Sequence, residues 1–118
     1  MRSGRTGTPL ALELGLKPGI RCWFHNMPNA VRAAIDPERA QVEEQPTASD
    51  GLHCAHLFVA DRDQLARELA AVQPLLAANG FLWAWWHEAG PLGATEVRAA
   101  ASARGLIDVQ ACTAGTGW

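Results

Sequence analysis

The chain has 118 residues, 48% hydrophobic and 19% charged, which fits one globular domain and excludes a disordered chain. Ten basic side chains stand against twelve acidic ones, and this balance argues against the concentrated basic face of a nucleic-acid-binding protein. Five tryptophans are many for so short a chain, and three of them lie between Phe81 and Trp86.

No apolar stretch is long enough to span a membrane, and residues 1–8 lack the apolar core of a signal peptide. We therefore expect a cytoplasmic protein with a flexible arm over 1–8 and one domain over 9–118. The cysteines are odd in number and far apart, without a Cys-x-x-Cys motif. They predict buried, reduced thiols rather than disulfides or a zinc site.

The first ordered elements are expected to be a short helix and a buried strand. Thr8 and Pro9 have the residue types of an N-cap and a first helical position, and Gly15 ends the helix. Residues 20–25 are mostly apolar on both faces, which is the pattern of a central strand covered by helices on both sides.

A second short helix and two strands of unequal strength follow. Asn29 is a candidate N-cap for a helix over 30–35. Residues 40–44 are a polar strand candidate suited to a sheet edge, whereas residues 52–60 form a second strongly apolar strand.

The longest helix is expected directly after that strand. Asp61 and Gln64 have the spacing of a capping box. Apolar positions then recur at helical spacing, at Leu65, Leu69, Val72 and Leu76. Pro74 predicts a break just before it, and we expect Asn79–Gly80 to end the segment.

The third strong strand is expected over residues 81–86. Trp83 and Trp85 point to one face of it and Trp86 to the other. These tryptophans are either core side chains or a stacking surface for a planar ligand or a partner. We expect exposed rings at Trp86 and Trp118. Two elements complete the pattern, a helix capped by Thr95 and ending near Arg104, and a fourth strong strand over 106–112.

Strands that alternate with helices predict a parallel sheet with right-handed crossovers. The expected fold is a three-layer, Rossmann-like α/β domain with four to five mostly parallel strands flanked by helices.

Ligands of such sheets bind at the carboxyl ends of the strands. The candidate ligand-binding residues at this strand-end rim are His25, Asn26, Met27, Asp61, Arg62, Trp86, His87 and Glu88. The functional interpretation is a polar cleft with acid–base capacity. The structural alternative makes Asp61 a helix cap, His25 a strand-end residue bonded to a nearby carbonyl, and His87 and Glu88 solvated loop residues.

Cofactor and nucleophile motifs are absent from the sequence. The turn after the first strand has no glycine where a dinucleotide site needs backbone to approach a pyrophosphate. Neither a P-loop nor a Gly-x-Ser-x-Gly motif occurs. We therefore assign no cofactor, no metal and no catalytic residue.

Five segments in order carry a family resemblance: Gly7–Leu10, Leu14–Gly19, Ala55–Val59, Leu75–Trp83 and Gly105–Cys112. From residue 7 onward the chain resembles a bacterial family known only as domain of unknown function 3052. That resemblance implies a reduced Rossmann core similar to S-adenosylmethionine-dependent methyltransferases. Methyltransferases carry a Gly-rich loop where this chain has Met27–Pro28. The family pattern also continues past Trp118 into a last apolar strand that is missing here.

Three functions follow as hypotheses. The first is a non-enzymatic or degenerate Rossmann-like module that binds a small molecule or a partner protein at the rim. The second is a small enzyme, methyltransferase-like or using His25 with Asp61 or Glu88 as acid and base. The third is a homo-oligomer that pairs through an incomplete sheet edge.

Overall fold

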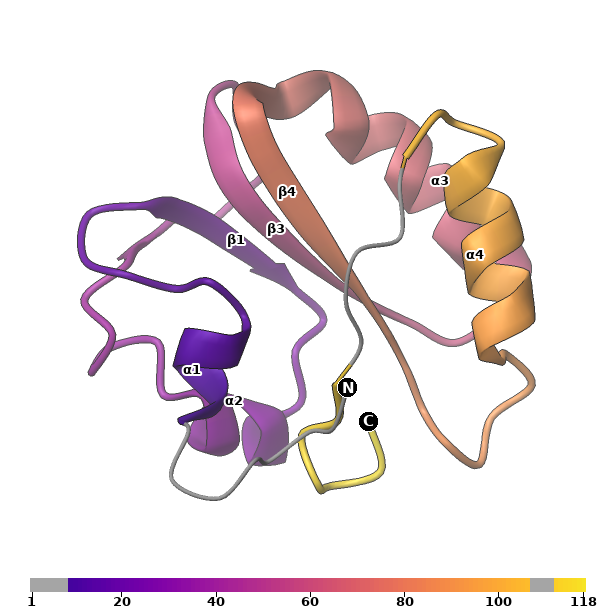
Figure 1. Cartoon of the computed structure of the whole chain (residues 1–118), viewed down its shortest axis with the longest axis horizontal. Coiled ribbons are helices and arrows are strands. Elements are labelled where there is room, and N and C mark those ends of the chain that lie inside the picture. Colours follow the sequence, from indigo (N-terminus) through magenta and orange to yellow (C-terminus); the bar gives the residue numbers. More distant parts are fainter. Residues whose placement is uncertain (1–8, 107–111) are drawn as a thin grey trace.

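The computed structural model describes residues 9–106 and 112–118 (Figure 1). They form a four-stranded, all-parallel sheet in the order β2-β1-β3-β4 with helices on both faces. The strands are β1 Arg21–His25, β2 Glu43–Glu44, β3 Leu52–Val59 and β4 Leu76–Trp86. The helices are α1 Leu10–Glu13, α2 Asn29–Ile35, α3 Arg62–Val72 and α4 Ala94–Ser102, with a 3-10 turn, η1, over Gln73–Leu75. The predicted α/β fold with a parallel sheet is confirmed.

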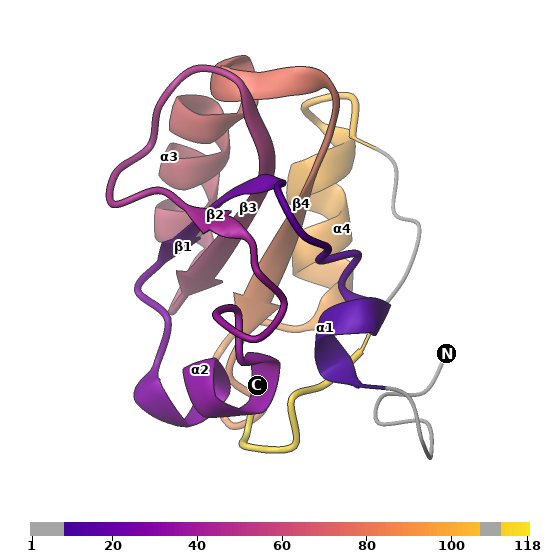
Figure 2. The same ribbon diagram turned by 90° about the vertical axis from the view of Figure 1, so that its left-hand side faces the viewer.

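The sheet is the middle one of three layers and separates two layers of helices (Figures 1 and 2). Helices α1 and α2 cover one face, where the buried side chains are Leu14, Leu16, Cys22, Phe24, Val31, Ile35, Cys54, Phe58 and Trp85. Helices α3 and α4 cover the other, where they are Leu52, Ala55, Leu57, Val59, Leu65, Leu69, Val72 and Leu92. From Cys54 onward, even and odd positions of β3 therefore contribute to two separate cores, whereas Leu52, which precedes the register shift, lies in the same core as the odd positions.

Strand β3 is central, and His53 is its one exposed side chain. Helices cover both faces of β3, which is why apolar side chains point to both faces of the strand and even its second histidine, His56, is buried. The edge strand β2 is short and polar. Arg32 of α2 binds it through two hydrogen bonds to the Glu44 carboxylate, at 3.0 and 2.6 Å.

Two predicted helix caps are wrong. Pro28 takes the N-cap position of α2 in an extended conformation, so Asn29 is the first helical residue and its side chain caps nothing. Gly93 is the N-cap of α4 in place of Thr95. The Oε1 atom of Glu96 accepts a hydrogen bond from the Gly93 backbone N–H at 2.9 Å. This contact satisfies a free helix-end donor without a capping side chain at Gly93.

Two further boundaries differ from the prediction. Pro9 is the N-cap of α1 rather than its first residue, and the expected cap Thr8 lies outside the described residues. The strand predicted over 40–44 is reduced to Glu43–Glu44, because the chain turns at Gln41 with φ 61°.

The entry into β4 also corrects the sequence analysis. The helix breaks before Pro74 as predicted, but β4 begins at Leu76, which is therefore not helical. Asn79–Gly80 lies inside the strand, where the pairing with β3 shifts register. A Cβ on Gly80 would lie 3.0 Å from the backbone oxygens of Ala77 and Leu52, so this irregularity requires glycine.

The tryptophans of β4 divide between the faces as their alternation predicts. Trp83 and Trp85 pack toward α1 and α2, and Trp86 packs toward α3 and α4. The expectation of exposed rings is wrong for Trp86 and Trp118, which are half-buried. Most of the strand predicted over 106–112 lies outside the described residues.

Candidate functional site

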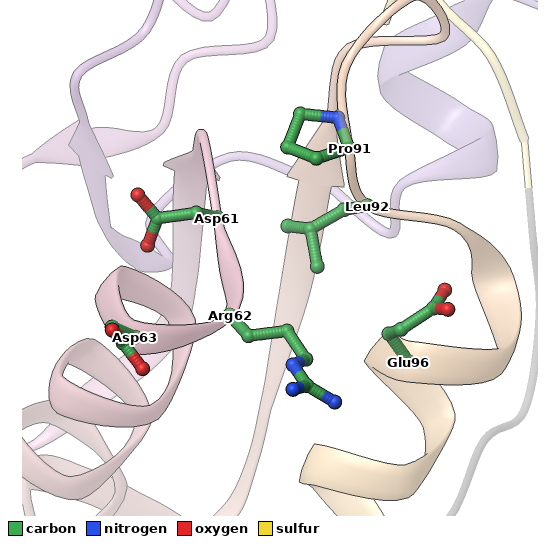
Figure 3. Close-up of a pocket in the computed structure, with 6 residues that line it drawn as sticks. All are labelled: Asp61, Arg62, Asp63, Pro91, Leu92 and Glu96. Carbon is green, nitrogen blue, oxygen red and sulfur yellow. The ribbon is translucent and has the colours of Figure 1, made fainter.

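A polar cavity of about 390 Å³ opens at the carboxyl ends of β3 and β4. The residues that line it are Asp61, Arg62, Asp63, Pro91, Leu92 and Glu96. Figure 3 shows Arg62 extending from the start of α3 into the space between α3 and α4, with Glu96 across that space on α4. Because each parallel strand ends where its following helix begins, the cavity receives both helix N-termini.

Two of these carboxylates hold the helix ends. Asp61 Oδ1 accepts a hydrogen bond from the Gln64 backbone N–H at 2.8 Å, and Gln64 Oε1 accepts one from the Ala60 N–H at 2.8 Å. The predicted N-cap at Asp61 is thus confirmed, although Gln64 accepts from Ala60 and not from the N-cap residue itself as a capping box requires. Glu96 accepts from the N-cap residue of α4, Gly93. Arg62 and Asp63 form no ion pair with any residue that the structure describes.

A second cavity of about 370 Å³ adjoins the first and shares Leu92 with it. Its lining residues are Ala84, Trp85, Trp86, Glu88, Leu92, Gly93, Cys112, Thr113 and Trp118. They come from the end of β4, the loop before α4 and the segment 112–118, and three of them are tryptophans.

The loop after β4 holds the segment 112–118 in place. The Glu88 backbone N–H donates to the Gly117 carbonyl at 2.6 Å. The Trp118 ring lies edge-on to Phe58, with centroids 5.5 Å apart, and to His87, at 5.4 Å. A Cβ on Gly117, which has φ 93°, would lie 2.7 Å from His87 Nε2. His87 therefore supports a wall of the second cavity without lining it.

His25 forms a separate polar cluster at the end of β1. Its Nε2 atom lies 3.1 Å from Glu68 Oε2 of α3, and its ring stacks on Trp23 with centroids 4.6 Å apart. The Gln64 side-chain amide donates to the same Glu68 oxygen at 3.0 Å. This cluster contributes no side chain to either cavity.

The carboxylate that contacts His25 is thus Glu68 and not the expected Asp61 or Glu88. Sequence reasoning missed Glu68 because it follows the cap by two helical turns. Its spacing of four from Gln64, on the same side of one helix, was the available signal.

The structure divides the predicted rim. The cavities together take in Asp61, Arg62, Trp86 and Glu88. Asn26 is exposed with φ 61°, and Met27 packs against the α1/α2 core. Asp63, Pro91, Leu92 and Glu96 were not anticipated. Only the position of Glu96, three residues after the glycine cap, marked it in the sequence.

Two of the three cysteines, Cys54 and Cys112, have thiols whose pKa is raised, so both are protonated at neutral pH. Burial raises the pKa of Cys54 far above its usual value, and Cys22 faces it across β1 and β3. Burial, together with the charge of Glu13, raises the pKa of Cys112 to about 11. Thiolate is the reactive and metal-binding form, so Cys112 offers the second cavity only a neutral thiol. Residues 9–106 and 112–118 contain no group of three or more histidine, cysteine or acidic side chains placed to hold a metal ion.

No protein-family model matches this chain, and neither do the curated proteins or the solved structures. The resemblance to domain of unknown function 3052 therefore stays a prediction. Within the described segments, no helix combines the length and the apolar character needed to cross a bilayer.

Proposed function

We propose that this chain is a Rossmann-like module that binds a small ligand at the carboxyl ends of β3 and β4 and does not itself catalyse a reaction. The observation that carries the proposal is the pair of adjoining cavities, about 390 and 370 Å³, that meet at Leu92. Each has the volume of an ordinary small-molecule pocket, and each lies where open parallel sheets bind their ligands.

The chemistry of the lining favours binding over catalysis. Asp61 and Glu96 use carboxylate oxygens to hold helix ends, and Cys112 is a neutral thiol because burial raises its pKa to about 11. His25 and Glu68 lie outside both linings. Arg62, the carboxylates and the tryptophans are side chains suited to recognising a ligand. Their presence at the cavities is explained by binding alone and does not require an acid–base pair.

The test is an NMR titration of isotope-labelled protein with S-adenosylmethionine, adenosine, choline and inorganic phosphate. We expect at least one probe to shift the amides of residues 61–63 and 86–96 and the indole N–H signals. Asp50, in an exposed loop outside both cavity linings, serves as an internal control whose amide stays unchanged. If no probe shifts the rim at millimolar concentration, or if the shifts lie elsewhere, the proposal fails.

The His25–Glu68 contact supports a second candidate, an acid–base enzyme. A carboxylate that accepts from Nε2–H leaves Nδ1 as the basic nitrogen, as in many catalytic histidines. Hydrolysis of a nitrophenyl ester by the native chain and by His25→Gln tests this. A rate above that of buffer that disappears in the variant supports it, and equal rates end it.

Self-association stays open as a third function, because β4 stands at the end of the strand order among the described residues and an unpaired edge invites pairing. Sedimentation velocity across a concentration series tests it. A single monomeric species at all concentrations would overturn it. A cytoplasmic location likewise remains a proposal.

A further inference from the structure

The second cavity gathers three of the chain's tryptophans at one place. Trp85 is 4% exposed and stacks on Phe58, with centroids 5.1 Å apart and planes 12° from parallel. Trp118 meets Phe58 and His87 edge-on. These contacts hold the two rings in fixed orientations, because each ring packs against a neighbour whose own position is set by β3 or by the loop after β4.

Trp86 is the tryptophan of this cavity whose ring makes the fewest aromatic and hydrogen-bond contacts with the described residues. It is half-buried and packs against aliphatic side chains of the α3/α4 core. Within the part of the chain that is described, it stacks on no other aromatic ring, and its Nε1–H has no hydrogen-bond acceptor. Packing against aliphatic side chains does not require an indole ring. The π-face of Trp86 is therefore suited to contact a ligand.

The charge around this cavity is negative. Among the described residues that line it, Glu88 is the only one with an acidic or basic side chain other than Cys112, whose thiol stays protonated. Among the described residues, the lining of the adjoining cavity adds three carboxylates, Asp61, Asp63 and Glu96, against the single guanidinium of Arg62. The combined field attracts cations and repels phosphates and carboxylates.

From these features, and resting on the proposed function above, we infer that the second cavity binds a compact organic cation, namely a methylated or quaternary ammonium group. Indole faces attract such a cation through the ring quadrupole, and tryptophan is the strongest of the aromatic side chains in this respect. Glu88 supplies the opposite charge at the mouth, and the volume of about 370 Å³ accommodates a choline-sized molecule.

An anion or a neutral heterocycle is a poorer occupant. An anion would meet Glu88 and gain no compensating cation from the lining residues that the structure describes. A neutral ring would stack on Trp86 but leave Glu88 without a counter-charge. Only a cation uses both the aromatic faces and the carboxylate.

The experiment compares two molecules of the same shape and different charge. Choline and its uncharged isostere 3,3-dimethyl-1-butanol are titrated into the native chain, and tryptophan fluorescence and the indole N–H signals are followed. We expect choline to bind and the isostere to bind at least about tenfold more weakly, as loss of one cation–π contact implies.

Two variants and one control complete the design. Glu88→Gln keeps the shape of an exposed side chain and should weaken choline about fivefold without affecting the isostere. Trp86→Leu should weaken choline about tenfold. Glu38→Gln, an exposed carboxylate that lines neither cavity, should bind choline as the native chain does.

The outcomes separate this inference from the proposed function. Equal binding of choline and the isostere, or binding of phosphate or adenosine at the rim without choline, overturns the cation site and leaves a ligand-binding module. Failure of every probe to shift the rim overturns both. Preferential choline binding that Glu88→Gln weakens supports both.

Discussion

His56 gives this fold a pH dependence that can be worked out from its surroundings. It is 0% exposed, its Nδ1 atom accepts a hydrogen bond from Trp85 Nε1–H at 3.0 Å, and its ring packs against Phe24 with centroids 4.7 Å apart. Its Nε2 atom is buried and finds no partner within the described chain. Burial in this apolar site lowers the pKa of His56 from 6.5 to about 3.

The consequence for stability follows from where the proton can bind. The unfolded chain takes up a proton at His56 below about pH 6.5, whereas the folded chain does not until about pH 3. The stability that neutral His56 contributes is therefore fully present above the pKa of the unfolded chain, and it is lost as the pH falls toward the pKa of the folded chain. Between about pH 7 and about pH 5 the loss is about 2 kcal/mol, a large share of the stability of a small domain.

The measurement is urea denaturation followed by circular dichroism at the two pH values, for the native chain and for His56→Gln. Glutamine keeps an acceptor for the Trp85 indole but does not titrate. We expect the free energy of unfolding of the native chain to fall by about 2 kcal/mol more than that of the variant. The His25–Glu68 and Arg32–Glu44 pairs are common to both proteins, so their contributions cancel.

Equal pH dependence in the two proteins would refute the reasoning. If His56→Gln does not fold, an NMR titration of the native histidines replaces the comparison. In that experiment the His56 signals should stay those of a neutral imidazole down to about pH 4. A transition near pH 6.5 would show that burial does not govern this residue.

Two further predictions concern the ends of the site. Asp61→Ala removes the acceptor for the Gln64 N–H and should cost about 1 kcal/mol in the free energy of unfolding by urea denaturation; an unchanged midpoint would contradict the cap. Gly117→Ala places a Cβ 2.7 Å from His87 Nε2 at φ 93°, whereas Gly115→Ala, at φ 78°, meets no atom within 4 Å. Both variants carry backbone strain of about 1 kcal/mol, but only Gly117→Ala should also change tryptophan fluorescence. Identical fluorescence spectra of the two variants would contradict the packing of Trp118 against His87.

The sheet was predictable because its strands are buried in a regular way. Residues 52–60 carry apolar side chains on both faces, which is the pattern typical of a covered central strand, and β3 is that strand. Asp61 was predictable as a cap because its partner is three residues away in the sequence. In both cases the information is local, or repeats with the period of the element.

The wrong or missed predictions concern features that depend on how distant or neighbouring segments approach an element, not on the pattern within it. Asn29 and Thr95 have the residue types of caps, yet Pro28 and Gly93 take those positions because the incoming chain approaches each helix in an extended conformation. Leu76 fits the helical period, but the break at Pro74 releases it into β4. The contact of His25 with Glu68 joins residues from β1 and α3. The spacing of Glu68 from Gln64 marks its place on α3 but does not indicate that His25 lies next to it.

The adjacent pair Trp85–Trp86 explains why an aromatic cavity forms at the end of β4 and not along it. Successive side chains of a strand point to opposite faces, so within the sheet these two rings belong to separate cores and cannot line one space. At the last residues of the strand the covering layers turn away into the loop before α4, and both rings reach a common edge. Trp118 closes that edge from the segment 112–118, held by the contact of Glu88 with Gly117. The same backbone contact that orders the wall thus also fixes the backbone of Glu88, whose carboxylate the proposed cation site requires.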